Sequence, residues 1–267
     1  MCIRDRIYIK RDNKNDEHSG ISGFFKLKNE IKNNLFDKVF IFNSSLRYRL
    51  VCISAGIKNI YQYPLFEKKE QHIIDAANKL LDKINLKVES NPRIKINESS
   101  VKLAAQRLSI SKDKINILLG IGGSGPSKRI PADKFKEFIE LAIRSYDCMF
   151  YLATGKNKEE QSILNSILSS YKEICVPLDN NSISENLPII KNCKIAICND
   201  SSFSHLSAAL GVPTIVLMSD TPLLYGSYSP NMYPIIPDGM NFVSHNSRGK
   251  EKINPEKIFT KFKSIIN

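Results

Sequence analysis

The chain has 267 residues, of which 42% are hydrophobic and 25% are charged. This composition is typical of globular proteins, and the length allows two domains of ordinary size. No apolar run approaches the roughly 20 residues of a membrane-spanning helix, and the N-terminus carries no apolar signal core. The net charge of +12 suits an anionic partner. The lysines of the chain form no dense basic block, however, so the sequence indicates no nucleic-acid-binding motif.

The cysteines indicate a reducing compartment. The six thiols include no Cys-x-x-Cys pair, and four of them lie inside apolar strand-like or helix-like runs, where cysteine usually acts as a small buried hydrophobe. We therefore expect reduced structural thiols in the cytoplasm, without disulfides or a bound metal. The cysteines are Cys2, Cys52, Cys148, Cys175, Cys193 and Cys198.

The first part of the chain, residues 1–112, shows an irregular succession of strand-like and helix-like segments. Expected strands are 7–9, 39–42 and 59–63; expected helices are 44–54 (capped by Ser44 and ended by Gly56), 71–84 and 98–109 (capped by Asn97). One βαβ unit alone takes about 30 residues, and the segment at 7–9 looks like a strand already inside a domain. We therefore expect a Rossmann-like N-terminal domain that is truncated and lacks its first strand and loop.

The second part, residues 113–267, alternates strands and helices regularly. Expected strands are 115–120, 148–154, 173–178, 195–199, 214–219 and 233–237. Expected helices follow at about 132–146, 156–170, 184–192, 203–210 and 255–265, the last with Asn254 at its N-cap and Pro255 at its first position. Such alternation predicts an α/β domain with a parallel, doubly wound sheet.

A glycine-rich loop, residues 120–131, follows directly after the first of these strands. Glycine lets a backbone approach a ligand closely, and Lys128 supplies a mobile cation. The loop formally matches G-x-G-x-x-G, but Pro126 and Pro131 delay the helix, and the second strand ends in 153–155 without a carboxylate. An NAD-dependent oxidoreductase is therefore disfavoured, because that fingerprint needs both features.

A second motif runs from 195 to 219 as strand, polar turn, helix, tight turn and strand. Asp200, Ser201 and Ser202 stand where the helix begins, followed by Phe203 and His205. A helix that starts where a parallel strand ends points unpaired N–H groups and the positive end of its dipole into the crevice above the sheet. The pattern predicts a phosphate-binding helix start.

The two motifs and the turn at 154–160 should meet, because all three leave carboxyl ends of strands in one sheet. Lys128 could then bridge a diphosphate held by the helix start, at about 1.5–3 kcal/mol for each charge-assisted hydrogen bond. Glu159 is suited to ribose hydroxyls or is an exposed first-turn carboxylate. Two interpretations stay open for Asp200, which either belongs to this site or only caps the helix. Two also stay open for His205, which either belongs to the site or is a histidine packed in the core.

Three blocks resemble glycosyltransferase family 9, best known for the ADP-heptose:lipopolysaccharide heptosyltransferases. They are Lys128-Arg-Ile-Pro131 after the Gly/Ser loop, Gly155-x-x-x-Glu159, and Asn199-Asp-Ser-Ser-Phe-Ser-His205 continuing to Pro213. The resemblance implies a GT-B architecture of two Rossmann-like domains, the N-terminal one incomplete here, with no metal requirement and no cofactor. It implies an ADP-heptose-like donor bound by the C-terminal half. The donor-binding residues it implies are Ser124, Lys128, Glu159, Asp200, Ser201, Ser202, Phe203 and His205.

The resemblance also implies the reaction. It is an inverting, metal-independent transfer of a heptose-like sugar to a lipopolysaccharide core or related glycan. We expect it in the cytoplasm, with peripheral contact to the inner membrane surface. The family's acidic general base belongs to the first loop of the N-terminal domain, so none is assigned here. Ile130 and Ser202 stand where the family usually has Trp and Gly, which leaves donor preference open. Alternatives are a sugar-nucleotide epimerase or hydrolase, and a non-catalytic remnant that binds nucleotide-sugars.

Overall fold

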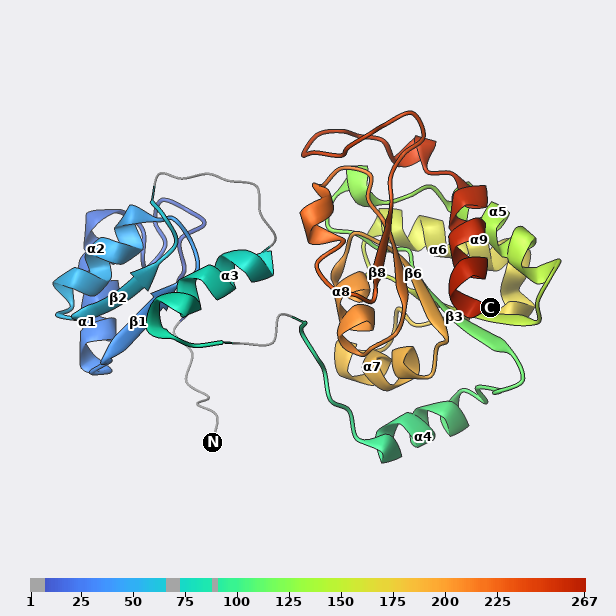
Figure 1. Cartoon of the computed structure of the whole chain (residues 1–267), viewed down its shortest axis with the longest axis horizontal. Coiled ribbons are helices and arrows are strands. Elements are labelled where there is room, and N and C mark those ends of the chain that lie inside the picture. The colour runs from blue at the N-terminus through green and yellow to red at the C-terminus, as the bar shows by residue number, and fades with distance from the viewer. Residues whose placement is uncertain (1–7, 66–72, 88–90) are drawn as a thin grey trace. The chain divides into compact units, whose positions relative to one another are not determined.

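The computed structural model describes residues 8–65, 73–87 and 91–267 (Figure 1). By its contacts the chain divides into two compact units, residues 1–88 and 89–267. Each is an α/β unit and is described by itself. In the described residues, no helix is long and apolar enough to cross a membrane.

The smaller unit contains a two-stranded parallel sheet. Its elements are α1 (Gly20–Asn33), β1 (Lys38–Ile41), α2 (Leu46–Ser54), β2 (Asn59–Gln62), α3 (Ile73–Leu81) and the 3-10 turn η1 (Asp82–Ile84). The buried side chains of Ile41, Cys52 and Ile57 form its core. Gly56 ends the turn after α2 with a φ of +88°, a conformation that favours glycine.

Two expectations for this unit are wrong, and part of a third falls on residues that the structure does not describe. Helix α2 has Ser45, not Ser44, at its N-cap, and the backbone N–H of Ser45 donates to the Asn43 side chain instead. Residues 8 and 9 form no strand, since they pair with no neighbouring strand. Residues 7, 71 and 72 of the expected strand and helix lie outside the described residues.

The larger unit is built on a six-stranded parallel sheet in the order β5-β4-β3-β6-β7-β8. The strands are β3 (Ile115–Gly120), β4 (Cys148–Ala153), β5 (Cys175–Pro177), β6 (Ile195–Asn199), β7 (Thr214–Leu217) and β8 (Met232–Ile235). All five neighbouring pairs are parallel. The predicted doubly wound sheet is thus confirmed. The sequence order of the strands changes direction between β3 and β6. In folds of this kind, ligands bind at the carboxyl ends of the strands at that point.

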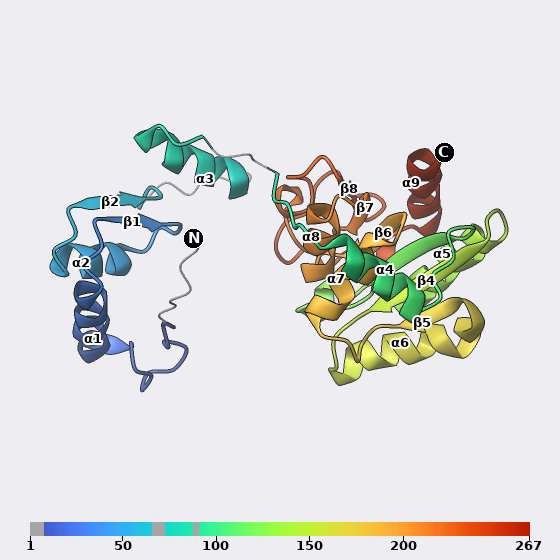
Figure 2. The same ribbon diagram turned by 90° about the horizontal axis from the view of Figure 1, so that it is seen from below.

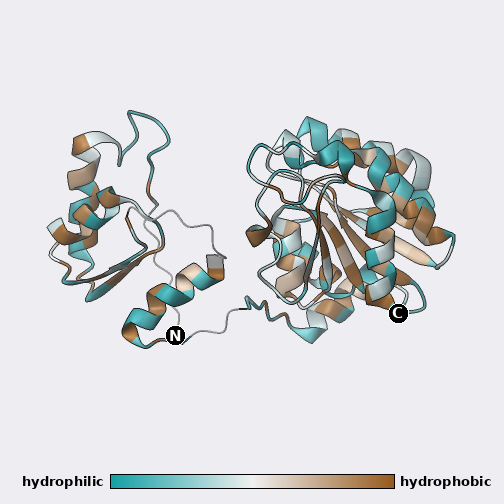
Figure 3. Ribbon diagram, turned by 45° about the horizontal axis from the view of Figure 1, so that its top comes forward, coloured by the Kyte–Doolittle hydropathy of each residue, from teal (hydrophilic) through white to brown (hydrophobic). Residues whose placement is uncertain are grey.

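Helices cover both faces of this sheet (Figures 1 and 2). They are α4 (Glu98–Arg107), α5 (Ala132–Ile143), α6 (Lys158–Tyr171), α7 (Ile183–Lys191), α8 (Ser202–Ala209) and α9 (Pro255–Ile266), with 3-10 turns η2 (Pro126–Lys128), η3 (Lys172–Ile174), η4 (Leu223–Tyr225) and η5 (Lys250–Lys252). The core of one face holds side chains of α5, α6 and α9, and that of the other holds α4, α7 and α8. The strands between them are hydrophobic along their length (Figure 3), as double coverage requires.

Helix α4 packs on the larger unit, although the sequence patterns assign residues up to 112 to the N-terminal domain. Ala104 is buried in the same core as residues of α7, and the Asn192 side chain donates to the Val101 carbonyl at 3.0 Å. The backbone N–H of Ile94 bonds to the Ala209 carbonyl at 2.8 Å. By contacts the division therefore falls after residue 88. The predicted caps of α4 and α9 are confirmed, since Asn97 and Asn254 accept backbone N–H groups of their helices.

The cysteines of the described residues are all free and buried, as expected of structural thiols: Cys52, Cys148, Cys175, Cys193 and Cys198. Burial raises the pKa of Cys148 to about 11 and that of Cys175 and Cys198 to about 12. Burial thus favours the protonated form of each thiol, which fits a structural role. Cys2 lies outside the described residues.

Candidate functional site

Three loops leave the sheet at one edge, on either side of the point where the strand order reverses. Gly120 at the end of β3 is in register with Ala153 of β4 and with Cys198 of β6. The loops at 121–131, 154–157 and 200–201 therefore start side by side. Asn199 joins two of them, because its side-chain amide donates to the Ile121 carbonyl at 2.8 Å.

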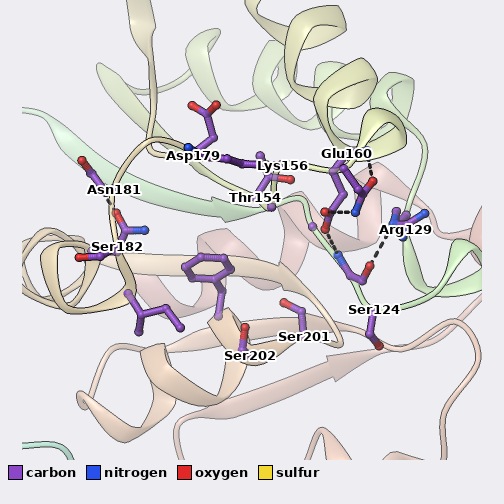
Figure 4. A pocket seen from close by; sticks show the side chains of 17 residues that line it. Ser124, Arg129, Thr154, Lys156, Glu160, Asp179, Asn181, Ser182, Ser201 and Ser202 are labelled. Atoms are coloured by element: carbon purple, nitrogen blue, oxygen red, sulfur yellow. Dashed lines mark hydrogen bonds between the residues drawn. The ribbon is translucent and has the colours of Figure 1, made fainter. Parts of the chain in front are cut away.

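These loops and the turn after β5 enclose a pocket of about 660 Å³ (Figure 4). Of the predicted donor-binding residues, Ser124, Ser201, Ser202 and Phe203 line it. Lys128, Glu159, Asp200 and His205 do not. The full lining is Gly122, Gly123, Ser124, Arg129, Thr154, Gly155, Lys156, Asn157, Glu160, Asp179, Asn181, Ser182, Ile183, Asn186, Ser201, Ser202 and Phe203.

Helix α8 begins at the wall of this pocket. Its N-cap is Ser201, whose side chain makes no capping bond, so the capping role considered for Asp200 is not observed. The Ser201 hydroxyl is buried without a hydrogen-bond partner among the described residues, and so is that of Thr154, a residue only 6% exposed. Buried polar atoms normally have partners, so these two hydroxyls are available to a polar ligand.

Lys128 and Asp200 lie beside the start of α8 and form an ion pair. The distance from Lys128 Nζ to Asp200 Oδ2 is 2.7 Å, and the Asp200 side chain is 6% exposed. The predicted proximity of residue 128 to residues 200–205 is therefore observed. The ammonium group is held by a carboxylate, so an anionic ligand would have to share it or displace that carboxylate.

His205, one turn into α8, hydrogen-bonds through Nδ1 to the hydroxyl of Tyr228 at 2.8 Å. Burial lowers the pKa of His205; the Asp200 carboxylate opposes this and the Lys128 ammonium adds to it. Burial thus favours the neutral imidazole, which lies within electrostatic reach of the Lys128–Asp200 pair.

The two neighbouring glutamates of α6 differ sharply in environment. The Glu159 side chain is 66% exposed and forms an ion pair with Arg129. Glu160, only 6% exposed, faces the pocket, where Oε1 accepts the backbone N–H of Gly123 at 2.8 Å and Oε2 accepts from the Asn157 side chain. The carboxylate that reaches the ligand space is therefore Glu160 rather than the predicted Glu159.

Two glycines make room for the Glu160 carboxylate. A Cβ on Gly122 would lie 2.6 Å from Oε1, and one on Gly155 would lie 2.4 Å from Oε2. Both contacts are shorter than real Cβ contacts, so any side chain at either position would push the carboxylate away. These glycines are thus required by a buried side chain of the protein itself.

One group in the described residues has the composition of a metal site: Glu17, His18 and Glu30, whose ligand atoms lie within 4.8 Å of one another. It lies in the smaller unit. His18 Nε2 contacts Glu30 at 3.2 Å, and its Nδ1 accepts the backbone N–H of Lys10 at 3.1 Å. Glu17 pairs with Lys26. Each ligand atom thus already has a partner within the protein, which favours a structural role for the cluster.

The family is decided by the comparison with family models. The model of glycosyltransferase family 9 (heptosyltransferase) matches residues 45–261, which is more than half of the chain. The chain belongs to glycosyltransferase family 9. A Campylobacter coli lipopolysaccharide heptosyltransferase 1 is 28% identical over 150 residues, which are 54% of this chain and 43% of the relative. The match therefore spans less than half of that relative's length.

Two solved structures confirm the fold class. A family 9 glycosyltransferase from Veillonella parvula superimposes with a TM-score of 0.71 at 18% identity, covering 93% of this chain and 79% of that one. An Escherichia coli ADP-heptose LPS heptosyltransferase II gives 0.64 at 19% identity, covering 92% and 81%. The α/β fold of GT-B type predicted from the family 9 motifs is thus confirmed.

Several residues of this family 9 pocket have no counterpart in the sequence prediction. Glu160 is the third residue of α6, a position where a carboxylate often accepts a hydrogen bond from the N-cap residue. The spacing of Asn157 and Glu160 could therefore have indicated that the Glu160 side chain turns back toward the start of the helix. Arg129 donates from Nε to the Gly123 carbonyl at 2.9 Å and so fixes the glycine-rich loop. The rest come from the turn after β5 and the start of α7: Asp179, Asn181, Ser182, Ile183 and Asn186.

Proposed function

We propose that the chain is the donor-binding part of an inverting, metal-independent glycosyltransferase, which moves a heptose-like sugar from an ADP-heptose-like donor to a lipopolysaccharide core or related glycan acceptor. The observation that carries the proposal is the position of Lys128 and the start of α8 at one edge of the sheet, beside a pocket of about 660 Å³, in a family 9 chain. The name of the Escherichia coli structure, an ADP-heptose transferase, supports the donor class.

The pocket suits a nucleoside diphosphate. Amides at the start of α8 and in the glycine-rich loop offer donors to phosphate oxygens, and Thr154 and Ser201 add unpartnered hydroxyls. Phe203 offers an aromatic ring among the lining residues. We assign to Glu160, whose carboxylate faces the pocket, the contact with ribose hydroxyls first expected of Glu159. Nucleotide-sugars need no cofactor in this reaction.

The reaction develops negative charge where this site can receive it. The oxygen of an acceptor hydroxyl bonds to the anomeric carbon, the bond from that carbon to the diphosphate breaks, and its electron pair leaves with the diphosphate. The transition state resembles an oxocarbenium ion. Lys128 and the α8 start are preorganised donors for the departing charge, the arrangement that lowers such barriers most. The acceptor's proton passes to a base that we do not assign.

Lys128→Ala tests the proposal. Loss of one charge-assisted hydrogen bond should weaken binding of an ADP-sugar at least tenfold in titration calorimetry. Since the variant also leaves Asp200 without its ion-pair partner, circular dichroism should confirm that it folds. Lys102→Ala, the same change on an exposed position of α4, is the matched control and should bind normally. Unchanged affinity in folded Lys128→Ala would remove the lysine from the site.

We also propose that the reaction takes place in the cytoplasm, at the inner membrane surface where a glycolipid acceptor resides. The net charge of +12 supports this, because each lysine or arginine near an anionic leaflet contributes about 1 kcal/mol. Co-sedimentation with anionic vesicles at low salt, lost at high salt and with neutral vesicles, is the expected result. Equal recovery with both kinds of vesicle would contradict it.

A further inference from the structure

We propose that Tyr228 is a positioning residue, which fixes the tautomer of His205 so that the imidazole offers Nε2–H as a neutral hydrogen-bond donor. The inference rests on the proposed function, because the acceptor of that N–H would be the donor's sugar-diphosphate. Tyr228 lies between η4 and β8, outside the motif that contains His205.

The contact between the two rings is close and ordered. The Tyr228 hydroxyl lies 2.8 Å from Nδ1 of His205. The rings also stack, with centroids 5.6 Å apart and planes at 18°. A hydrogen bond and a stack together restrict both the position and the rotation of the imidazole. In the part of the chain that the structure describes, Nε2 has no hydrogen-bond partner, so it is the nitrogen left for a ligand.

The segment that carries Tyr228 is held on both sides. The hydroxyl of Ser227 donates to the Leu223 carbonyl at 2.7 Å, and that of Ser229 donates to the Asn91 side chain at 2.8 Å. Asn231 ties the segment to α8 itself, since its side chain donates to the Ala208 carbonyl at 3.0 Å. Tyr228 is therefore placed against α8 by fixed contacts and does not depend on the histidine for its position.

The protonation states decide which group donates. Burial lowers the pKa of His205 and raises that of Tyr228, so a neutral imidazole meets a phenol that keeps its proton. The charged groups near the imidazole are Asp200, which favours its protonation, and Lys128, which opposes it. A phenol is a stronger donor than a neutral imidazole, and an imidazole nitrogen is the stronger acceptor. The hydroxyl therefore donates to Nδ1, and the ring proton resides on Nε2.

This tautomer assigns a role to His205. With Nε2 protonated and Nδ1 occupied, the imidazole has no free lone pair, so it cannot accept the proton of an acceptor hydroxyl. It can donate to a phosphate or sugar oxygen while it remains neutral beside the Lys128 ammonium. Tyr228 would thus hold the neutral histidine in the tautomer that donates from Nε2.

Nitrogen NMR of the full chain tests the inference without any ligand. The chain has four histidines, and the signals of His205 are assigned by their loss in His205→Gln. We expect one proton-bearing Nε2 and a bare Nδ1 in the native protein. In Tyr228→Phe, which keeps the stacked ring, we expect a mixture of tautomers and a higher pKa. Tyr225→Phe, the same change in the same loop beside His245, should leave His205 unaltered. A protonated Nδ1, or an identical spectrum in Tyr228→Phe, would overturn the assignment.

Calorimetry with ADP then tests the consequence for binding. Loss of the fixed donor should weaken ADP binding about two- to tenfold in Tyr228→Phe and leave it unchanged in Tyr225→Phe. Equal affinity of native and Tyr228→Phe protein would overturn the positioning role. Failure of the native protein to bind ADP would instead contradict the proposed function, while the NMR result would still report the tautomer.

Discussion

Adjacent side chains of α6 show how one position along a helix changes the role of a glutamate. Glu159 points to solvent and pairs with Arg129, whereas Glu160 is buried between two glycines and holds the backbone of Gly123. This ion pair is open to water at its Glu159 end, where water screens it, so it contributes little to stability. A buried carboxylate that accepts a backbone N–H contributes more, because its removal leaves that donor unpaired.

Removing Glu160 should therefore cost much more than removing Glu159. We expect Glu160→Ala to lower the free energy of unfolding by about 1–3 kcal/mol, because the Gly123 N–H loses its partner inside the protein. Glu159→Ala should change it by no more than about 0.5 kcal/mol. Urea denaturation of the two variants measures the difference. Equal stability of both would show that Glu160 does not hold the loop.

The sequence predicts that the glycine-rich loop, Lys128 and the start of α8 lie at one sheet edge, because each follows a strand whose apolar run is easy to recognise; the structure places them there. It does not distinguish Glu159 from Glu160, since which of two adjacent side chains turns inward depends on where α6 begins. The glycine pattern predicts close approach to a ligand; the neighbour that Gly122 and Gly155 in fact accommodate is Glu160, from another element, which no local pattern reveals.

Among the elements, α9 closes one face of the sheet through a group of aromatic rings. Phe262 is fully buried and meets Phe138 and Tyr146 edge to face, each with centroids 5.6 Å apart. Such contacts add to the free energy gained by burial alone. The helix periodicity and the Asn254–Pro255 start predict this element from the sequence, because both signals are local.

Truncating Phe262 should loosen α9 strongly. We expect Phe262→Ala to destabilise the chain by about 3–5 kcal/mol, because a large buried ring leaves a cavity against α5. Lys263→Ala, on the next residue of the same helix, should have a far smaller effect. Thermal unfolding of the two variants checks this. A similar melting temperature for both would mean that α9 contributes little to the core.

The elements that the sequence misassigns are those held by contacts distant in sequence. Helix α4 has a correct local prediction, down to its Asn97 cap, yet it packs on the larger unit through Asn192 and α7. Residues 8 and 9 have the composition of a strand but no strand to pair with. Local propensity predicts an element's existence, whereas its partners are settled by tertiary packing.

For the whole molecule, the strand order of the larger unit matters most, since it brings the functional loops together. With β3 and β6 adjacent, loops more than 70 residues apart in sequence meet at one sheet edge, and Lys128 reaches Asp200. The alternation of strands and helices in the sequence predicts a parallel sheet, and hence that these loops lie at the same sheet edge. On the β5 side, the Ser182–Glu185 capping box indicates where α7 begins, but it does not indicate that this turn lines a pocket.

The most direct test of the central claim, a nucleoside diphosphate bound where these loops meet, is to map ADP on the full chain by backbone amide NMR. We predict that shift changes concentrate in residues 121–131, 154–160 and 200–205, with the amides of Gly123, Ser202 and Phe203 among the largest. Saturable binding that perturbs none of these loops, or no binding at millimolar ADP, would contradict the account.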